Sequence, residues 1–186
     1  MQSDLEITEA SSVDVSSILE INQQYLDSND EEGFLVVPYY KSELDQVISS
    51  TESTIFLAKS SSAGIVGYAK VSCNFQTDVL KGMAWNTVED KQTVAAILDS
   101  DFIYIAQVAV RKDVLRQGIA SQLYTHIENL NTPIIVFVAW VPIRNMASFH
   151  FHESRKYRKV GVLSRPMFGR FEDYQSLCYV HDYSAR

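Results

Sequence analysis

The chain has 186 residues, with 16 Lys or Arg against 23 Asp or Glu, so its formal charge is −7. This length favours one domain, which can bury about 70% of the surface of its unfolded form without needing disulfides. A hydrophobic share of 46% is that of an ordinary globular protein. The acidic charge excludes a general nucleic-acid binder, because such proteins rely on excess Lys and Arg facing phosphate.

Neither a metal site nor a membrane segment is indicated. Cys73 and Cys178 have no metal-ligand spacing around them, so we expect two reduced thiols and no metal. The N-terminus lacks the basic start and the apolar run of a signal peptide. The longest apolar run, 134–141, is shorter than the roughly 18 residues that a membrane span requires. We therefore expect a cytoplasmic protein without a membrane partner.

The first part of the chain is expected to form a strand, two helices and an antiparallel hairpin. In chain order these are a strand at 5–8, a helix starting after Ser11 and Ser12, an acidic loop at 27–32, an apolar patch at 34–37, a helix at 42–48 and strands at 54–58 and 65–71 around Gly64. The apolar face of the first helix is expected to consist of Val15, Ile18, Leu19 and Leu26.

The second part contains a strand, helix, strand unit. In chain order we expect a helix at 88–98, a strand at 102–110, a helix at 119–130 and a strand at 134–139. A helix between Pro142 and Arg155 and a hairpin of 159–163 with 175–180 follow. The apolar stripe of the helix at 119–130 is Ile119, Leu123, Ile127 and Leu130. The continuous apolar run at 134–139 is typical of a strand in a parallel sheet. The pattern predicts an α/β protein with a mixed sheet and helices on its faces.

No repeat, linker or Pro/Gly-rich break divides the chain, so we expect a single domain over 1–186. The segment 74–101 carries Trp85 in a loop-like stretch before its helix. Its length is unusual for a connection inside a compact domain, and such segments are often binding loops. We expect it to be a functional excursion.

The turn between the strand at 102–110 and the helix at 119–130 favours an anion. Gly118 lets the backbone approach a ligand closely, and the first amides of a helix point outward at the positive end of its dipole. Arg111, Lys112 and Arg116 add positive charge in the same stretch. The alternative is an ordinary turn between a strand and a helix. Neither a nucleotide-triphosphate P-loop nor a Rossmann glycine motif is present here.

The string L115-R-Q-G-I-A120 resembles the acyl-CoA loop of the GNAT family (Gcn5-related N-acetyltransferases), Q/R-x-x-G-x-G/A, at Gly118 and Ala120. Leu115 departs from the first position of that motif. The order of elements is also similar to the family's over nearly the whole chain. The resemblance implies a mixed, mostly antiparallel sheet with helices on both faces and a central, splayed parallel strand pair, here 102–110 and 134–139.

The resemblance also implies acetyl-CoA as co-substrate. By this resemblance, the backbone of Val108 and Val110 contacts the pantetheine arm. The loop and the start of the helix contact the phosphates through Arg116, Gln117, Gly118, Ile119, Ala120 and Ser121.

A second motif lies on the helix after Pro142, where Asn145, Ser148 and His152 share one face. Such a face is either solvated or part of a site. Many GNAT members carry N-x-x-[SA]-x-x-x-Y here, so the resemblance implies that Asn145 and Ser148 contact the co-substrate. It also places His152 at the position of the tyrosine that returns a proton to the CoA thiolate. His150 points away from His152, which argues against a metal site.

The general base and the acceptor are left open. The histone-acetylating branch of the family has a Glu at the position that Tyr104 occupies, so we name no base. Residues 1–110 hold five basic and 17 acidic side chains (−12), and residues 111–186 hold 11 and six (+5). The basic part contains the loop assigned to CoA, a polyanion. The acidic part suggests a cationic amine acceptor: a polyamine, an amino sugar or a peptide amine.

We expect an N-acetyltransferase that acts by direct attack of the amine on the thioester. The alternative is a module of the same fold that binds CoA without turnover, and a further one is an unrelated α/β binding domain. A monomer and a homodimer are both compatible with the sequence.

Overall fold

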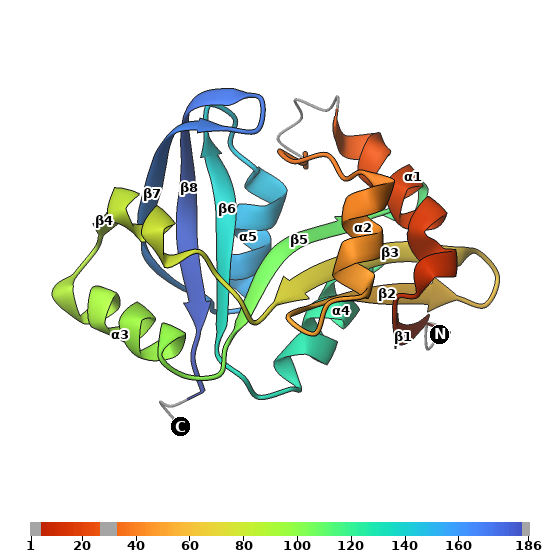
Figure 1. Ribbon diagram of the computed structural model, residues 1–186, viewed down its shortest axis with the longest axis horizontal. Coiled ribbons are helices and arrows are strands. Elements are labelled where there is room, and N and C mark those ends of the chain that lie inside the picture. The colour runs from red at the N-terminus through yellow and green to blue at the C-terminus, as the bar shows by residue number, and fades with distance from the viewer. Residues whose placement is uncertain (1–4, 27–32, 184–186) are drawn as a thin grey trace. The chain divides into compact units, whose positions relative to one another are not determined.

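The computed structural model of the protein describes residues 5–26 and 33–183. The chain divides into two compact units, and each is described by itself (Figure 1). The first unit takes the described residues of 1–27, 38–72 and 105–131, and the second those of 28–37, 73–104 and 132–186. No helix in the described ranges has the length and apolar character needed to cross a membrane.

The first unit is a strand layer with helices on both faces. Its elements are β1 (Leu5–Glu9), α1 (Val15–Leu26), α2 (Lys41–Ile48), β2 (Ser53–Ser60), β3 (Gly64–Ser72), the end of β5 (Ile103–Val110) and α4 (Ile119–Glu128). Phe56 on β2 contacts His126 of α4, with ring centroids 4.8 Å apart. Tyr68 on β3, the partner of Leu57, bonds to Asn22 of α1. Since successive strand residues point to opposite faces, α1 and α4 lie on opposite faces of the hairpin (Figure 1).

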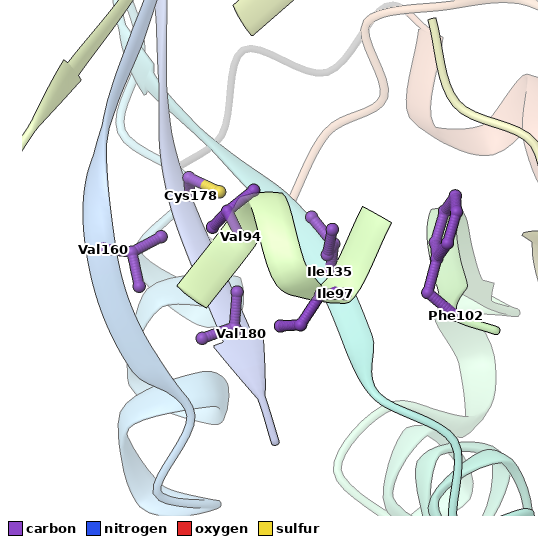
Figure 2. Close-up of a cluster of buried hydrophobic side chains, with 7 residues drawn as sticks. All are labelled: Val94, Ile97, Phe102, Ile135, Val160, Cys178 and Val180. Atoms are coloured by element: carbon purple, nitrogen blue, oxygen red, sulfur yellow. The ribbon is translucent and has the colours of Figure 1, made fainter. Parts of the chain in front are cut away.

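The second unit has the same layered plan. Its elements are the start of β5, β4 (Met83–Trp85), α3 (Val88–Leu98), β6 (Ile134–Val141), α5 (Met146–Ser154), β7 (Arg158–Phe168) and β8 (Phe171–His181). Figure 2 shows its core, in which α3 packs on the strands: Val94, Ile97, Phe102, Ile135, Val160, Cys178 and Val180. Cys178 faces α3, and the next residue, Tyr179, stacks on His152 of α5. Consecutive residues of β8 therefore point to opposite faces of the strand layer, one toward α3 and the other toward α5.

The eight strands form one sheet in the order β1-β2-β3-β5-β6-β8-β7-β4. Its pairs are antiparallel except for β5 with β6. This confirms the mixed, mostly antiparallel sheet and its strand, helix, strand unit. The hairpins β2-β3 and β7-β8 are also confirmed, the second longer than expected.

Some details differ from the sequence-based expectations. Trp85 lies in β4, opposite Gly161 of β7, and not in a loop, because three residues suffice to extend a sheet edge. Leu130 is 49% exposed, since α4 ends at Glu128 and no longer directs it toward the sheet. In α1 the buried face is Val15, Ile18, Ile21, Asn22 and Tyr25, while Leu19 and Leu26 are half-buried. The acidic loop at 27–32 lies outside the described residues.

The two cysteines, Cys73 and Cys178, do not form a disulfide. Cys73 is exposed and Cys178 is buried. Burial raises the pKa of the Cys178 thiol to about 12. Because the thiolate is the reactive form, Cys178 is a packing residue of the core.

The start of the first helical segment depends on a carboxylate. Asp14 ends a short 3-10 turn (Ser12–Asp14) and accepts hydrogen bonds from the backbone N–H and the hydroxyl of Ser11, at 2.9 and 2.8 Å. Lys59 lies 3.3 Å from the same carboxylate. Burial alone would raise the pKa of Asp14, but these partners outweigh burial and lower it below its usual value.

Replacing Asp14 with Asn should lower the free energy of unfolding by about 1 kcal/mol at neutral pH. A carboxyl whose pKa is lowered by folding stabilises the protein above its unfolded pKa, and this contribution is lost as pH falls through the folded pKa. The deficit of the variant, measured by urea unfolding, should therefore shrink as pH falls below 3.8, the usual pKa of an aspartate. An unchanged deficit at acidic pH would contradict this role.

Candidate functional site

The loop between β5 and α4 presents backbone amides to solvent. After a short turn (Lys112–Val114), Arg116 and Gly118 adopt left-handed conformations with φ of 64° and 80°. Gly118 is the N-cap of α4 and has no side chain that could cap the helix. A Cβ at Gly118 would meet no heavy atom within 4 Å. The first amides of α4 have no intrahelical acceptor, and the space beside Gly118 is open at the positive end of the helix, which suits a phosphate group.

The predicted loop residues differ in what they can offer a ligand. Arg116, Gln117 and Gly118 are exposed, and Ala120 and Ser121 are half-buried. Ile119 is 4% exposed and packs in the core, so only its backbone could reach a ligand. The side chains that can contribute charge or hydrogen bonds are thus those of Arg116, Gln117 and Ser121.

The other two basic residues of this stretch are held by the protein. Arg111 binds Asp113 through two hydrogen bonds of 2.6 and 3.0 Å and donates a third to the carbonyl of Ala63. The hydrogen bonds from Arg111 lower the pKa of the Asp113 carboxyl. Lys112 lies over the ring of Tyr25, 5.1 Å from its centroid. The expected positive charge of the loop is therefore partly neutralised.

The backbone of β5 alternates between pairing with β3 and pointing away from it. Arg111 N–H donates to the carbonyl of Val66 on β3 at 2.8 Å. In an antiparallel pair, bonded residues alternate, so the backbone groups of Val108 and Val110 point away from β3. The carbonyl of Val110 accepts from the hydroxyl of Tyr25 at 2.5 Å. The carbonyl of Val110 therefore already has a partner within the protein.

A buried polar network, which the sequence did not predict, holds Gln107 of β5. The side-chain oxygen of Gln107 accepts from the Tyr68 hydroxyl at 2.6 Å and from Asn22 at 3.1 Å. The oxygen of Asn22 accepts from the backbone N–H of Tyr39 at 3.1 Å. Burial raises the pKa of Tyr68, which stays a neutral donor. A sequence signal existed in Asn22, a polar residue on the apolar face of α1, but its partners come from distant segments.

In the second unit, α5 carries the predicted face of Asn145, Ser148 and His152. Asn145 is the N-cap, and its side chain accepts from the Ser148 N–H at 3.0 Å. Nδ1 of His152 lies 2.7 Å from the carbonyl of Ser148. Because a carbonyl only accepts, Nδ1 carries a proton and donates it there. Any proton that His152 delivers elsewhere must leave from Nε2.

His152 is buried, not solvated. It is 2% exposed, stacks on Tyr179 with ring centroids 5.6 Å apart, and meets Tyr157 edge to face at 5.3 Å. Asn145 and Ser148 are half-buried. His150, for which the sequence argues against a metal-ligand role, is exposed, and His126 packs on Phe56. The described residues contain no group of three or more His, Cys, Asp or Glu that could hold a metal ion.

The family of the chain follows from its sequence. A sequence model of the "Acetyltransferase (GNAT) family" matches residues 17–157. The match covers more than half of the chain and includes the loop at Gly118 and the helix α5. The protein therefore belongs to the GNAT acetyltransferase family. A comparison with curated proteins finds no match.

Solved structures share the fold at low sequence identity. NAA60 of Arabidopsis thaliana in complex with acetyl-CoA superposes with a TM-score of 0.69 at 11% identity, covering 97% of this chain and 99% of that one. The ribosomal-protein-S18-alanine N-acetyltransferase of Escherichia coli gives 0.65 at 13%, covering 98% and 96%. A variant of the spermidine N-acetyltransferase SpeG of Vibrio cholerae gives 0.64 at 15%, covering 96% and 93%. At such identities the likeness is one of fold.

Proposed function

We propose that the protein is an N-acetyltransferase that transfers an acetyl group from acetyl-CoA to a primary amine. The observation that carries this proposal is the start of α4, where a left-handed Gly118 leaves the first helical amides uncapped and facing open space. Membership of the GNAT family supports it. So does the neighbour of the same fold that was solved with acetyl-CoA.

The proposed reaction is a direct transfer. The neutral amine nitrogen attacks the thioester carbon, a C–N bond forms, and the C–S bond breaks as the tetrahedral intermediate collapses. The nitrogen loses one proton, and the leaving CoA thiolate gains one. The amine must first lose the extra proton of its ammonium form to solvent, and no base is assigned to this step.

Each predicted residue has a role in this proposal. The amides and side chains at 116–121 bind the phosphates of CoA, and the backbone of Val108 and Val110 binds its pantetheine arm. Asn145 and Ser148 contact the co-substrate, and His152 is the acid that protonates the thiolate. The fixed Nδ1–H of His152 supports a defined orientation of its ring.

The acceptor is proposed to be a small-molecule or peptide amine in its cationic resting form. The split between an acidic 1–110 and a basic 111–186 supports this. The neighbours range from an enzyme named for spermidine to one named for a protein alanine. We further propose that 1–186 acts as one catalytic domain in the cytoplasm, as a monomer or homodimer, and that the segment 74–101 contributes to acceptor recognition.

Calorimetry and a thiol-release assay test the proposal together. Acetyl-CoA should bind, and at least one class in a panel of polyamines, amino sugars, amino acids and peptide amines should release CoA. Binding without release by any amine would favour the silent CoA-binding module. If acetyl-CoA did not bind, both of these functions would be excluded.

A further inference from the structure

An arginine of β7 lies among aromatic rings. In the register of the β7-β8 hairpin, Arg165 is directly opposite Tyr174, so the two side chains share one face. The guanidinium carbon of Arg165 lies 4.4 Å from the centroid of the Phe168 ring, and Phe168 packs on Tyr174 at 5.0 Å. Tyr174 is 5% exposed. Arg165 thus lines an aromatic wall at the inner face of the hairpin.

The Nε atom of Arg165 is an unsatisfied donor. It is buried and has no hydrogen-bond partner in the part of the chain that the structure describes. Within the same residues, no carboxylate forms an ion pair with Arg165. This contrasts with Arg158 on the same strand, which pairs with Asp90. A buried donor left unpaired is costly, and more so if it is charged, so such a group usually has a partner in the working protein.

Two tyrosines interact electrostatically with the same guanidinium. Burial raises the pKa of both Tyr104 and Tyr174, and in both cases the positive charge of Arg165 opposes the rise. Tyr104 also contributes to the raised pKa of Tyr174. Both tyrosines stay protonated at neutral pH, so each hydroxyl can act as a hydrogen-bond donor beside the buried Nε of Arg165.

The surroundings of these donors are apolar. The ring of Tyr104 packs against Phe75 at 5.0 Å and Phe137 at 6.1 Å. Phe171 packs on Tyr174 at 6.3 Å. A charge held among rings is poorly screened, and its attraction for an opposite charge is stronger than in water. The arrangement therefore favours an anion with several acceptor atoms.

We propose that Arg165, Tyr104 and Tyr174 bind a carboxylate of the acceptor, so that the amine substrate is an amino acid or a closely related carboxylate-bearing amine. A carboxylate offers two oxygens with about four acceptor sites, enough for the guanidinium and both hydroxyls. This inference rests on the proposed function for the identity of the substrate, and it adds a negative group to the cationic amine expected from the charge split.

The hairpin itself provides a matched control. Arg170 is exposed and lies over the ring of Phe171, 5.0 Å from its centroid. It has the same charge and a similar aromatic contact but is not buried with an unpaired donor. Glu172, diagonal to Arg165 on the same face of the hairpin, is exposed and forms no ion pair with it among the described residues.

The experiment compares each amino acid of a panel with its carboxamide and its decarboxylated amine. The wild type should show a KM about 10- to 100-fold lower for the best amino acid than for its carboxamide. Arg165→Gln should remove this preference by raising KM for the acid, with kcat little changed, and Arg170→Gln should keep it. Tyr104→Phe, which retains the ring packing, should weaken the preference in part and keeps the test valid if Arg165→Gln fails to fold.

A binding measurement separates this inference from the proposed function. Calorimetry with the N-acetyl amino acid and with its carboxamide needs no turnover. Equal binding of the two, or a preference that survives in Arg165→Gln and Tyr104→Phe, would overturn the carboxylate site while leaving the transferase intact if CoA is still released. Preferential binding of the acid in a protein that does not bind acetyl-CoA would support the site and overturn the proposed function.

Discussion

Replacing Gly118 with valine should lower the affinity for acetyl-CoA tenfold or more, which corresponds to about 1.4 kcal/mol. Two effects act together. A β-branched residue resists the left-handed conformation at φ 80°, and the cost to folding is about 1–2 kcal/mol. The new side chain would also enter the open space in front of the first amides of α4, where the phosphates are proposed to lie. Calorimetry on the folded variant measures the affinity.

Gly64 separates strain from ligand binding. It is the first residue of β3, directly after the turn from β2, has a φ of 69°, and a Cβ there would also meet nothing within 4 Å. Gly64→Val should therefore lose a similar amount of stability in urea unfolding while binding acetyl-CoA as the wild type does. Equal loss of affinity in both variants would mean that the Gly118 effect comes from folding, and normal binding by Gly118→Val would refute the phosphate assignment.

The second large effect is expected at His152. His152→Phe keeps an aromatic ring against Tyr179 but has no proton to give to the thiolate. General acid catalysis contributes about 10²- to 10⁴-fold, so kcat should fall by about 100-fold while the affinity for acetyl-CoA changes little. Steady-state rates of the two proteins, with calorimetry for acetyl-CoA, measure both quantities.

A purely structural His152 would behave differently. The variant loses the hydrogen bond from Nδ1 to the Ser148 carbonyl, which should cost about 1 kcal/mol of stability. Tyr179→Phe is the control, because it removes a hydroxyl that donates to Glu153 at 2.8 Å from the same buried cluster. If both variants lost stability but kept the wild-type kcat, His152 would be a packing residue.

Local patterns were sufficient to predict most elements. The helix at 88–98 coincides with α3, and the expected hairpin at 54–58 and 65–71 lies within β2 and β3. The apolar run at 134–139 lies in β6, which pairs parallel with β5. These features follow from the spacing of apolar residues and from turn chemistry, which act within a few residues. The prediction that Trp85 lies in a loop was wrong, because its strand is defined only by pairing with β7, which is distant in sequence.

The candidate site also has features that follow from local sequence and features that depend on distant contacts. The proposed anion binding by the loop at Gly118 depends on one glycine and the helix that follows it, and both are visible in the sequence. The ion pair between Arg111 and Asp113 is also local, but the sequence does not show that their side chains point toward each other. The network around Gln107 joins Asn22, Tyr68 and Gln107 from α1, β3 and β5, and no local pattern brings them together.

The amino-acid sequence by itself determined the order of the elements, the mixed sheet and the helix start that suits a phosphate, because hydrophobic periodicity and glycine geometry are properties of neighbouring residues. Only the tertiary structure decided which polar groups are satisfied. It buried His152 against Tyr179, and it left Nε of Arg165, opposite Tyr174, without a hydrogen-bond partner among the described residues. Burial and pairing depend on contacts between distant segments, which no local pattern of residues specifies.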